Sequence, residues 1–166
     1  MQATAEDVLA FLKDKGLVLS TAESCTSGLI ASALADVSGA GACLDRAFVT
    51  YSVEAKIEML GVCRDTIERC NLTSEAVARE MALGALAASR ADVTVANTGV
   101  VDSTDDEIPA GTQCLAWAFR QAGDQPAIFS ETVRFDGDRR ALREQCVRYA
   151  LTQLPVYYRR MAGGTD

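Results

Sequence analysis

The sequence predicts a single α/β domain over residues 1–166, with three layers, α/β/α, and a mixed sheet of about five strands. Short β-branched runs alternate with apolar residues at helical spacing, which is the pattern of strands interleaved with helices. Two strand-like runs near the end, 113–120 and 127–135, are joined by a turn that contains Gly and Pro. We therefore expect these two runs to form an antiparallel hairpin within the sheet.

The beginning of the chain is predicted to form a helix, a strand and a second helix. The first helix follows Thr4, carries acidic residues in its first turn and is expected to stop at Gly16. A strand is expected from Leu17, and a hydroxyl-rich turn is expected over Thr21–Gly28. The second helix is expected to run to about Asp36.

The rest of the chain continues this alternation. We expect a strand over 47–51, a central strand over 92–97 that ends at Thr98 and Gly99, and a last helix over 138–154. Three helices are expected between the first two of these strands, namely a short one that carries Lys56, another over 64–69, and a longer one from Thr73 or Ser74 to about Ser89. Residues 161–166 are expected to form a flexible tail.

Composition narrows the class of protein. The net charge of −7 argues against a nucleic-acid partner, because such proteins usually carry a basic patch. No apolar run approaches the length of a membrane span, and the N-terminus lacks the apolar core of a signal peptide. We therefore expect a cytoplasmic protein without a membrane partner. The six cysteines form no C-x-x-C pair, so they are expected to be reduced, mostly buried and not zinc ligands.

The absence of histidine is the most informative feature of the composition. It excludes a Ser-His-Asp triad, a Cys-His dyad and any metal site ligated by histidine. Acid–base chemistry must then fall to Lys, Tyr, Asp or Glu. Lysine is also scarce, and of the three lysines only Lys56 lies outside the first helix.

Two turns carry side chains suited to catalysis. The first contains Ser24, and two interpretations apply to it, a helix N-cap or a nucleophile beside backbone N–H groups. The second contains Tyr51 and Ser52, with Lys56 one turn into the following helix. A lysine near a serine is the Ser–Lys form of nucleophilic catalysis, and burial would lower the proton affinity of the amine. The alternative is that Lys56 is an ordinary surface lysine.

Two charged segments also have open interpretations. The loop from Val100 to Pro109 contains four acidic residues, and a solvated acidic loop is favoured over a metal site because no EF-hand spacing is present. Three arginines crowd the start of the last helix, where they oppose the helix dipole. We expect at least one of them to have an anionic partner, either a carboxylate of the fold or a ligand phosphate; a solvated face is the alternative. These arginines are Arg139, Arg140 and Arg143.

Two longer motifs make the sequence recognisable. They are Thr21-Ala22-Glu23-Ser24-Cys25-Thr26 and Phe48-Val49-Thr50-Tyr51-Ser52-x-Glu54-Ala55-Lys56, and later segments agree with them in order, such as Pro109-x-Gly111-Thr112 and Phe135-x-Gly137-Asp138-Arg139. Over nearly its whole length the chain resembles the CinA C-terminal-domain family, whose enzymes are nicotinamide-nucleotide amidohydrolases. The resemblance implies an α/β/α fold and hydrolysis of nicotinamide mononucleotide to nicotinic acid mononucleotide and ammonia.

The resemblance also implies roles for individual residues. Ser24 matches the nucleophile, Lys56 the general base, and Tyr51 a tyrosine that orients the reactants or relays the proton. Arg139 matches an arginine suited to the substrate phosphate. The implied substrate-binding set is Glu23, Thr26, Ser27, Gly28, Thr98, Gly99 and Arg139, with backbone N–H groups of Thr26 to Gly28 forming an oxyanion or phosphate cradle. No metal or cofactor is implied, and a homo-oligomer is expected.

The chain departs from the family pattern at two places. The usual Thr-Gly-Gly is Thr26-Ser27-Gly28 here, which adds a side chain near the expected ligand. The family's glycine-rich loop after the central strand is replaced by an acidic one, which would repel a phosphate. Three hypotheses remain: an amidohydrolase of a pyridine nucleotide, an amidase with a different substrate, and an inactive homologue that binds a nucleotide or a partner.

Overall fold

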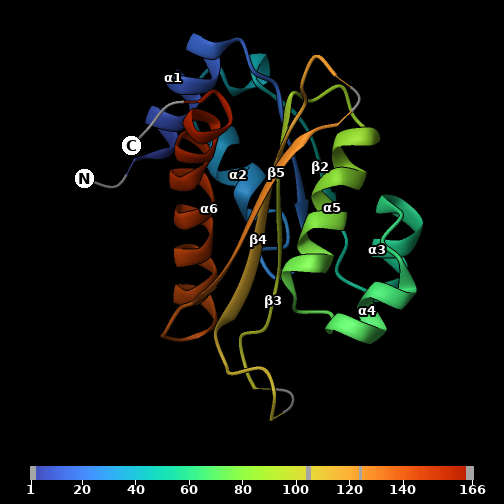
Figure 1. The fold of residues 1–166 in the computed structure, drawn as a ribbon. Coiled ribbons are helices and arrows are strands. Elements are labelled where there is room, and N and C mark those ends of the chain that lie inside the picture. Colours follow the sequence, from blue (N-terminus) through green and yellow to red (C-terminus); the bar gives the residue numbers. More distant parts are fainter. Residues whose placement is uncertain (1–2, 104–105, 124, 164–166) are drawn as a thin grey trace.

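A five-stranded mixed sheet forms the centre of the molecule (Figure 1). The computed structural model describes residues 3–103, 106–123 and 125–163. The strand order is β2-β1-β3-β4-β5, in which β1 runs parallel to β2 and β3 while the pairs β3–β4 and β4–β5 are antiparallel. The strands are β1 (Leu19–Glu23), β2 (Leu44–Val49), β3 (Val93–Gly99), β4 (Thr112–Phe119) and β5 (Ala127–Arg134). The predicted mixed sheet, its central strand and its hairpin are confirmed.

Helices cover both faces of this sheet and complete the predicted three layers. In Figure 1, α1, α2 and α6 lie on one side and α3, α4 and α5 on the other. The first group comprises α1 (Ala5–Lys15), α2 (Leu29–Ala35) and α6 (Arg139–Met161). The second comprises α3 (Val53–Leu60), α4 (Arg64–Cys70) and α5 (Glu75–Ala87), and a short 3-10 turn, η1 (Ala40–Ala42), precedes β2.

The two faces of β4 carry side chains of different size. Leu115, Trp117 and Phe119 join the core shared with α1, α2 and α6. Ala116 and Ala118 face the opposite way, into the core formed with α5. Because successive side chains of a strand point to opposite faces, this alternation places bulky residues under α6 and leaves room for α5 to approach the sheet closely.

Most helix starts are capped as the sequence indicates. Thr4 forms a capping box with Asp7 at α1, and Gly16 ends that helix in the left-handed conformation. Ser74, rather than Thr73, caps α5 by accepting a hydrogen bond from the Val77 N–H.

The hydroxyl-rich turn begins later than predicted. β1 begins at Leu19 rather than Leu17 and continues to Glu23, so only residues 24–28 form the turn. The N-cap of α2 is Gly28, with φ of 95° and no side-chain cap. The interpretation of the serines and threonines of this turn as a helix cap is therefore wrong.

The last helix is longer than predicted. α6 passes through Pro155 and ends at Met161 rather than Leu154. Proline removes one helical hydrogen bond, but the following turn is held by packing: the Tyr157 ring lies 4.6 Å from Trp117 and 4.9 Å from Phe129. Of the predicted flexible tail, Met161 is helical, and residues 164–166 lie outside the described residues.

Two further expectations concern the whole chain. Among the residues that the structure describes, every helix is too short or too polar to cross a membrane. All six cysteines are free thiols, of which Cys43, Cys114 and Cys146 are buried while Cys63 and Cys70 are exposed.

Candidate active site

Ser24 and Lys56 meet at one edge of the sheet. Ser24 directly follows β1, and Lys56 lies in α3, which begins four residues after β2 ends. β1 and β2 are neighbouring parallel strands, so their carboxyl ends lie at the same edge, where α/β proteins commonly bind ligands. Ser52 caps α3, and because helical side chains tilt toward the helix N-terminus, Lys56 points back toward the end of β2.

The lysine ammonium group makes three polar contacts. Lys56 Nζ lies 2.9 Å from Ser24 Oγ, 2.6 Å from the Thr50 carbonyl oxygen and 3.4 Å from the Tyr51 carbonyl oxygen. Carbonyl oxygens only accept, so they take two N–H groups of the amine. In a neutral amine the lone pair is then free to accept the proton of the Ser24 hydroxyl.

Burial favours the neutral form of Lys56, the form that can accept a proton. The residue has no exposed surface, and Ser24 is 8% exposed. Burial disfavours the charged form and lowers the pKa of Lys56 from 10.5 to about 8. At pH 7 about one amine in ten is then neutral, far more than for a lysine in water. The alternative interpretation, an ordinary surface lysine, is wrong.

Glu23 stabilises the turn that follows β1 through hydrogen bonds to its carboxylate. Its fully buried carboxylate accepts hydrogen bonds from the hydroxyls of Thr21 (2.8 Å) and Thr26 (2.7 Å). It also accepts from the backbone N–H groups of Gly28, Ile30 and Ala31 at 2.9–3.1 Å. A carboxylate at the N-terminus of α2 satisfies donors that Gly28 has no side chain to cap, and its charge complements the helix dipole.

We expect Glu23→Gln to lower the free energy of unfolding by about 3 kcal/mol, because a neutral amide leaves buried donors without an acceptor. The measurement is urea unfolding at pH 7. Glu58→Gln makes the same change at an exposed position of α3 and should leave the unfolding midpoint nearly unchanged. Equal midpoints for both variants would show that the carboxylate does not stabilise the turn.

Asn97 and Arg143 also hold the turn. Asn97 accepts from the Ser24 N–H through its backbone oxygen and from the Thr26 N–H through Oδ1, both at 3.0 Å. Arg143 donates to the carbonyl oxygens of Cys25 (2.9 Å) and Thr26 (3.1 Å). Asn97 was missed at the sequence level, although a polar residue at the end of a buried central strand is a usable signal.

A cavity of about 280 Å³ opens above Ser24. This is near the lower end of the range of small-molecule pockets, roughly 300–1,000 Å³. The lining comprises Ser24, Cys25, Tyr51, Asn71, Leu72, Thr73, Thr98, Gly99, Val100, Val101, Asp102 and Arg139. The strand ends, the α4–α5 connection, the loop after β3 and the start of α6 thus surround the serine.

The structure divides the predicted substrate-binding set in two. Thr98, Gly99 and Arg139 line the cavity, as does Tyr51, whose exposed fraction is 65%. A side chain at Gly99 would collide with Gln113, which explains glycine there. Four predicted contacts lie outside the lining, namely Glu23, Thr26, Ser27 and Gly28.

The predicted backbone cradle over Thr26 to Gly28 is wrong, because its N–H groups are already used. The Thr26 N–H donates to Asn97, the Ser27 N–H to the Ser24 carbonyl, and the Gly28 N–H to Glu23. Glu23 is likewise a structural anion rather than a wall of the cavity.

Ser27 adopts the left-handed conformation, with φ of 52°. That conformation favours glycine, so the family's glycine at this position is explained by backbone conformation rather than by close approach of a ligand. The Ser27 side chain is exposed.

The arginines at the start of α6 have partners, as predicted. Arg139 pairs with Asp102 at 2.7 Å and Arg140 with Glu144 at 2.8 Å. Asp105, one of the four acidic residues of the predicted loop, lies outside the described residues. Within the described ranges, no group of three or more acidic or cysteine side chains is arranged to hold a metal ion.

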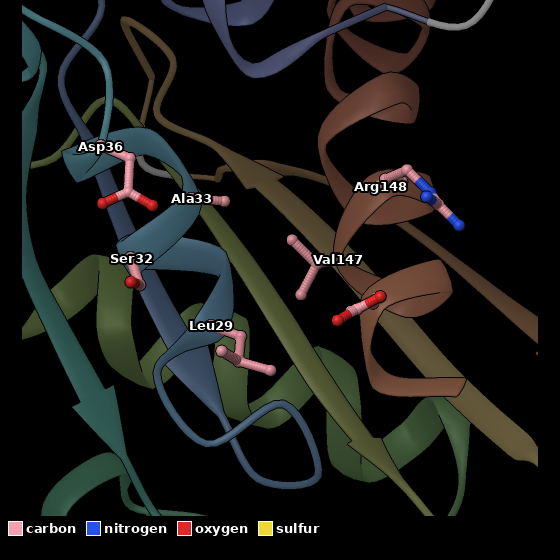
Figure 2. A pocket seen from close by; sticks show the side chains of 7 residues that line it. Leu29, Ser32, Ala33, Asp36, Val147 and Arg148 are labelled. Carbon is pink, nitrogen blue, oxygen red and sulfur yellow. The ribbon is translucent and has the colours of Figure 1, made fainter. Parts of the chain in front are cut away.

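A second cavity, of about 310 Å³, lies between α2 and α6. Figure 2 shows Leu29 and Ala33 of α2 facing Val147 of α6 across it. Its lining includes Ser32 but neither Ser24 nor a lysine. The cavity above Ser24 is therefore the candidate active site.

Comparisons with known proteins match one family along nearly the whole chain. The CinA C-terminal domain family model matches residues 1–157. The nicotinamide-nucleotide amidohydrolase PncC of Shigella flexneri is 42% identical over 152 residues, covering 90% of each chain. A CinA-like protein of Chlorobium luteolum is 41% identical over 96% of this chain and 37% of its own length.

A solved structure shows the same fold. The crystal structure of the competence/damage inducible protein CihA from Agrobacterium tumefaciens superposes with a TM-score of 0.82 at 39% identity, covering 89% of this chain and 88% of that one. With a family model matching nearly the whole chain and relatives above 40% identity, the chain belongs to the CinA C-terminal domain family.

Proposed function

We propose that this protein hydrolyses the carboxamide of nicotinamide mononucleotide, giving nicotinic acid mononucleotide and ammonia. The observation that carries the proposal is the 2.9 Å contact between Ser24 Oγ and the buried amine of Lys56, at the wall of a cavity. The name of the Shigella flexneri relative, nicotinamide-nucleotide amidohydrolase, supports the choice of substrate.

The proposed reaction begins with attack of Ser24 Oγ on the carboxamide carbon. Neutral Lys56 accepts the serine proton as the bond forms. The N–H groups of Thr26 to Gly28 are engaged within the turn, so we assign the developing oxyanion to the N–H of Cys25, which lines the cavity.

The second half releases the products. Protonated Lys56 returns its proton to the amide nitrogen, the C–N bond breaks, and ammonia leaves an ester on Ser24. Water then attacks the ester carbon, with Lys56 accepting a proton from the water and returning it to Ser24 Oγ. The products are nicotinic acid mononucleotide and the free enzyme.

The cavity walls supply the proposed substrate contacts. Arg139 is suited to the phosphate because a guanidinium binds phosphate oxygens through two parallel N–H groups. Thr98 and Gly99 border the ring and ribose, and Tyr51 orients the carboxamide beside Ser24. Glu23 acts as a positioning residue for the turn.

The test is incubation of the protein with nicotinamide mononucleotide, followed by measurement of ammonia and of the acid product. We expect both products in equal amounts. An inactive homologue would instead show a higher melting temperature with the nucleotide but no product. Absence of both product and thermal shift would overturn the proposed substrate.

A pH profile tests the role of Lys56. With a pKa lowered to about 8 by burial, the neutral base forms only as the pH rises through that value. We expect log kcat/KM to rise with unit slope from pH 6 to about 8 and then to level off. A flat profile between pH 6 and 10 would contradict a lysine base.

A further inference from the structure

An ion pair stands within the cavity that contains Ser24. Arg139 and Asp102 both line that cavity, and a guanidinium nitrogen of Arg139 lies 2.7 Å from Asp102 Oδ2. The two side chains are 60% and 76% exposed, so the pair lies at the solvent side of the cavity.

Both partners are carried by well-anchored backbone. Just before Asp102, the Val100 N–H donates to the Thr112 carbonyl (2.9 Å), and the Gly111 N–H donates to the Val101 carbonyl (3.0 Å). These bonds extend the β3–β4 pairing up to Asp102. Arg139 is the first residue of α6, which Asp138 caps by accepting from the Ala141 N–H at 2.8 Å.

A substrate phosphate would bind the guanidinium of Arg139, which already pairs with Asp102. Exposed ion pairs are weak, so Asp102 does not lock the cavity. A phosphate bound to Arg139 would nevertheless place up to two negative charges beside a third, and that repulsion opposes binding of a nucleotide. A pyridine nucleoside, which lacks the phosphate, leaves the ion pair intact.

We propose that Asp102 is an internal counter-ion for Arg139 that takes the place of a substrate phosphate and lowers the preference of this site for a nucleotide over the corresponding nucleoside. The inference rests on the proposed function. Its consequence is that wild-type protein also hydrolyses nicotinamide riboside, the non-phosphorylated form of the proposed substrate.

The first experiment compares kcat/KM for nicotinamide mononucleotide and nicotinamide riboside in wild type and Asp102→Asn. Removing the carboxylate should raise the value for the nucleotide about tenfold and leave the value for the nucleoside within about twofold. Asp106→Asn is the matched control, because Asp106 is exposed in the same loop and lies outside the cavity lining.

A double-mutant cycle separates the ion pair from general charge effects. In an Arg139→Gln background, Asp102→Asn should give no tenfold gain, because the site of competition has been removed. Inorganic phosphate provides a readout that does not need turnover: its dissociation constant, from thermal shift, should tighten about tenfold in Asp102→Asn.

The possible failures are distinct. An unchanged nucleotide-to-nucleoside ratio in Asp102→Asn, or an equal change in Asp106→Asn, would overturn the counter-ion role while the proposed function stands. If wild type hydrolyses neither compound, the proposed function fails, and phosphate binding alone decides the counter-ion role. Equal phosphate affinity of wild type and Asp102→Asn would then overturn that role as well.

Discussion

Replacement of Ser24 by alanine is expected to lower kcat for amide hydrolysis by about 10⁴-fold or more, because the variant has no atom to form the acyl ester. The fold should survive. The hydroxyl accepts one hydrogen bond from Lys56, whose other two contacts are backbone carbonyls that remain in place. The expected loss of stability is about 1 kcal/mol.

The measurement is ammonia release together with a thermal shift induced by nicotinamide mononucleotide, which should persist in Ser24→Ala. Ser32→Ala removes a hydroxyl from the second cavity and should retain wild-type turnover. Turnover that survives in Ser24→Ala but is lost in Ser32→Ala would move the active site to the cavity between α2 and α6.

Lys56→Met is expected to lower kcat by about 10³-fold or more while making the protein more stable at pH 7. Methionine resembles the lysine stem in shape but carries no base. The fall in pKa from 10.5 to about 8 corresponds to about 3 kcal/mol of cost for keeping the ammonium buried. Loss of the contacts to Thr50 and Ser24 offsets part of this, which leaves a net gain of about 1–2 kcal/mol.

The gain should depend on pH in a defined direction. Below pH 8, Lys56 is protonated in both the folded and unfolded states, so wild type bears the full cost of burial. Between about pH 8 and 10.5 the folded state releases the proton while the unfolded state keeps it, and wild-type stability rises. The difference in unfolding free energy between Lys56→Met and wild type should therefore shrink over this interval.

Taking the difference between the two proteins removes the contribution of every other ionisable group, because both proteins contain them. Lys13→Met, at an exposed position of α1, serves as the control and should show no such pH dependence. A Lys56→Met protein that unfolds more readily than wild type at pH 7 would contradict a costly buried ammonium.

The sequence was sufficient to predict the layers and the mixed sheet, and to single out Ser24 and Lys56, which the structure brings into contact. Hydrophobic periodicity is a local property, and the absence of histidine left few candidates for a base. The sequence was not sufficient to predict the role of Glu23. A carboxylate beside a serine has the same local sequence pattern whether it contacts a ligand or caps a helix. Only the extension of β1 through Glu23, which buries the carboxylate under α2, decides between the two.

Contacts between segments far apart in the sequence could not be predicted from local sequence patterns either. Asp102 and Arg139 lie 37 positions apart, and an acidic loop and an arginine-rich helix start each have several solvated interpretations. The extension of α6 past Pro155 depends on aromatic packing against β4 and β5, which helix propensity does not include. The homo-oligomer implied by the resemblance stays a prediction.

The two carbonyl oxygens that hold Lys56 belong to the main chain of Thr50 and Tyr51, not to their side chains. Substitutions at these positions can therefore change the shape and polarity near the cavity without displacing the Lys56 amine, provided that the backbone keeps its course. In such an arrangement, the residues that contact a ligand can change without a change in the position of Lys56. The side chains around the cavity can thus be replaced while the Lys56 amine keeps its two main-chain contacts.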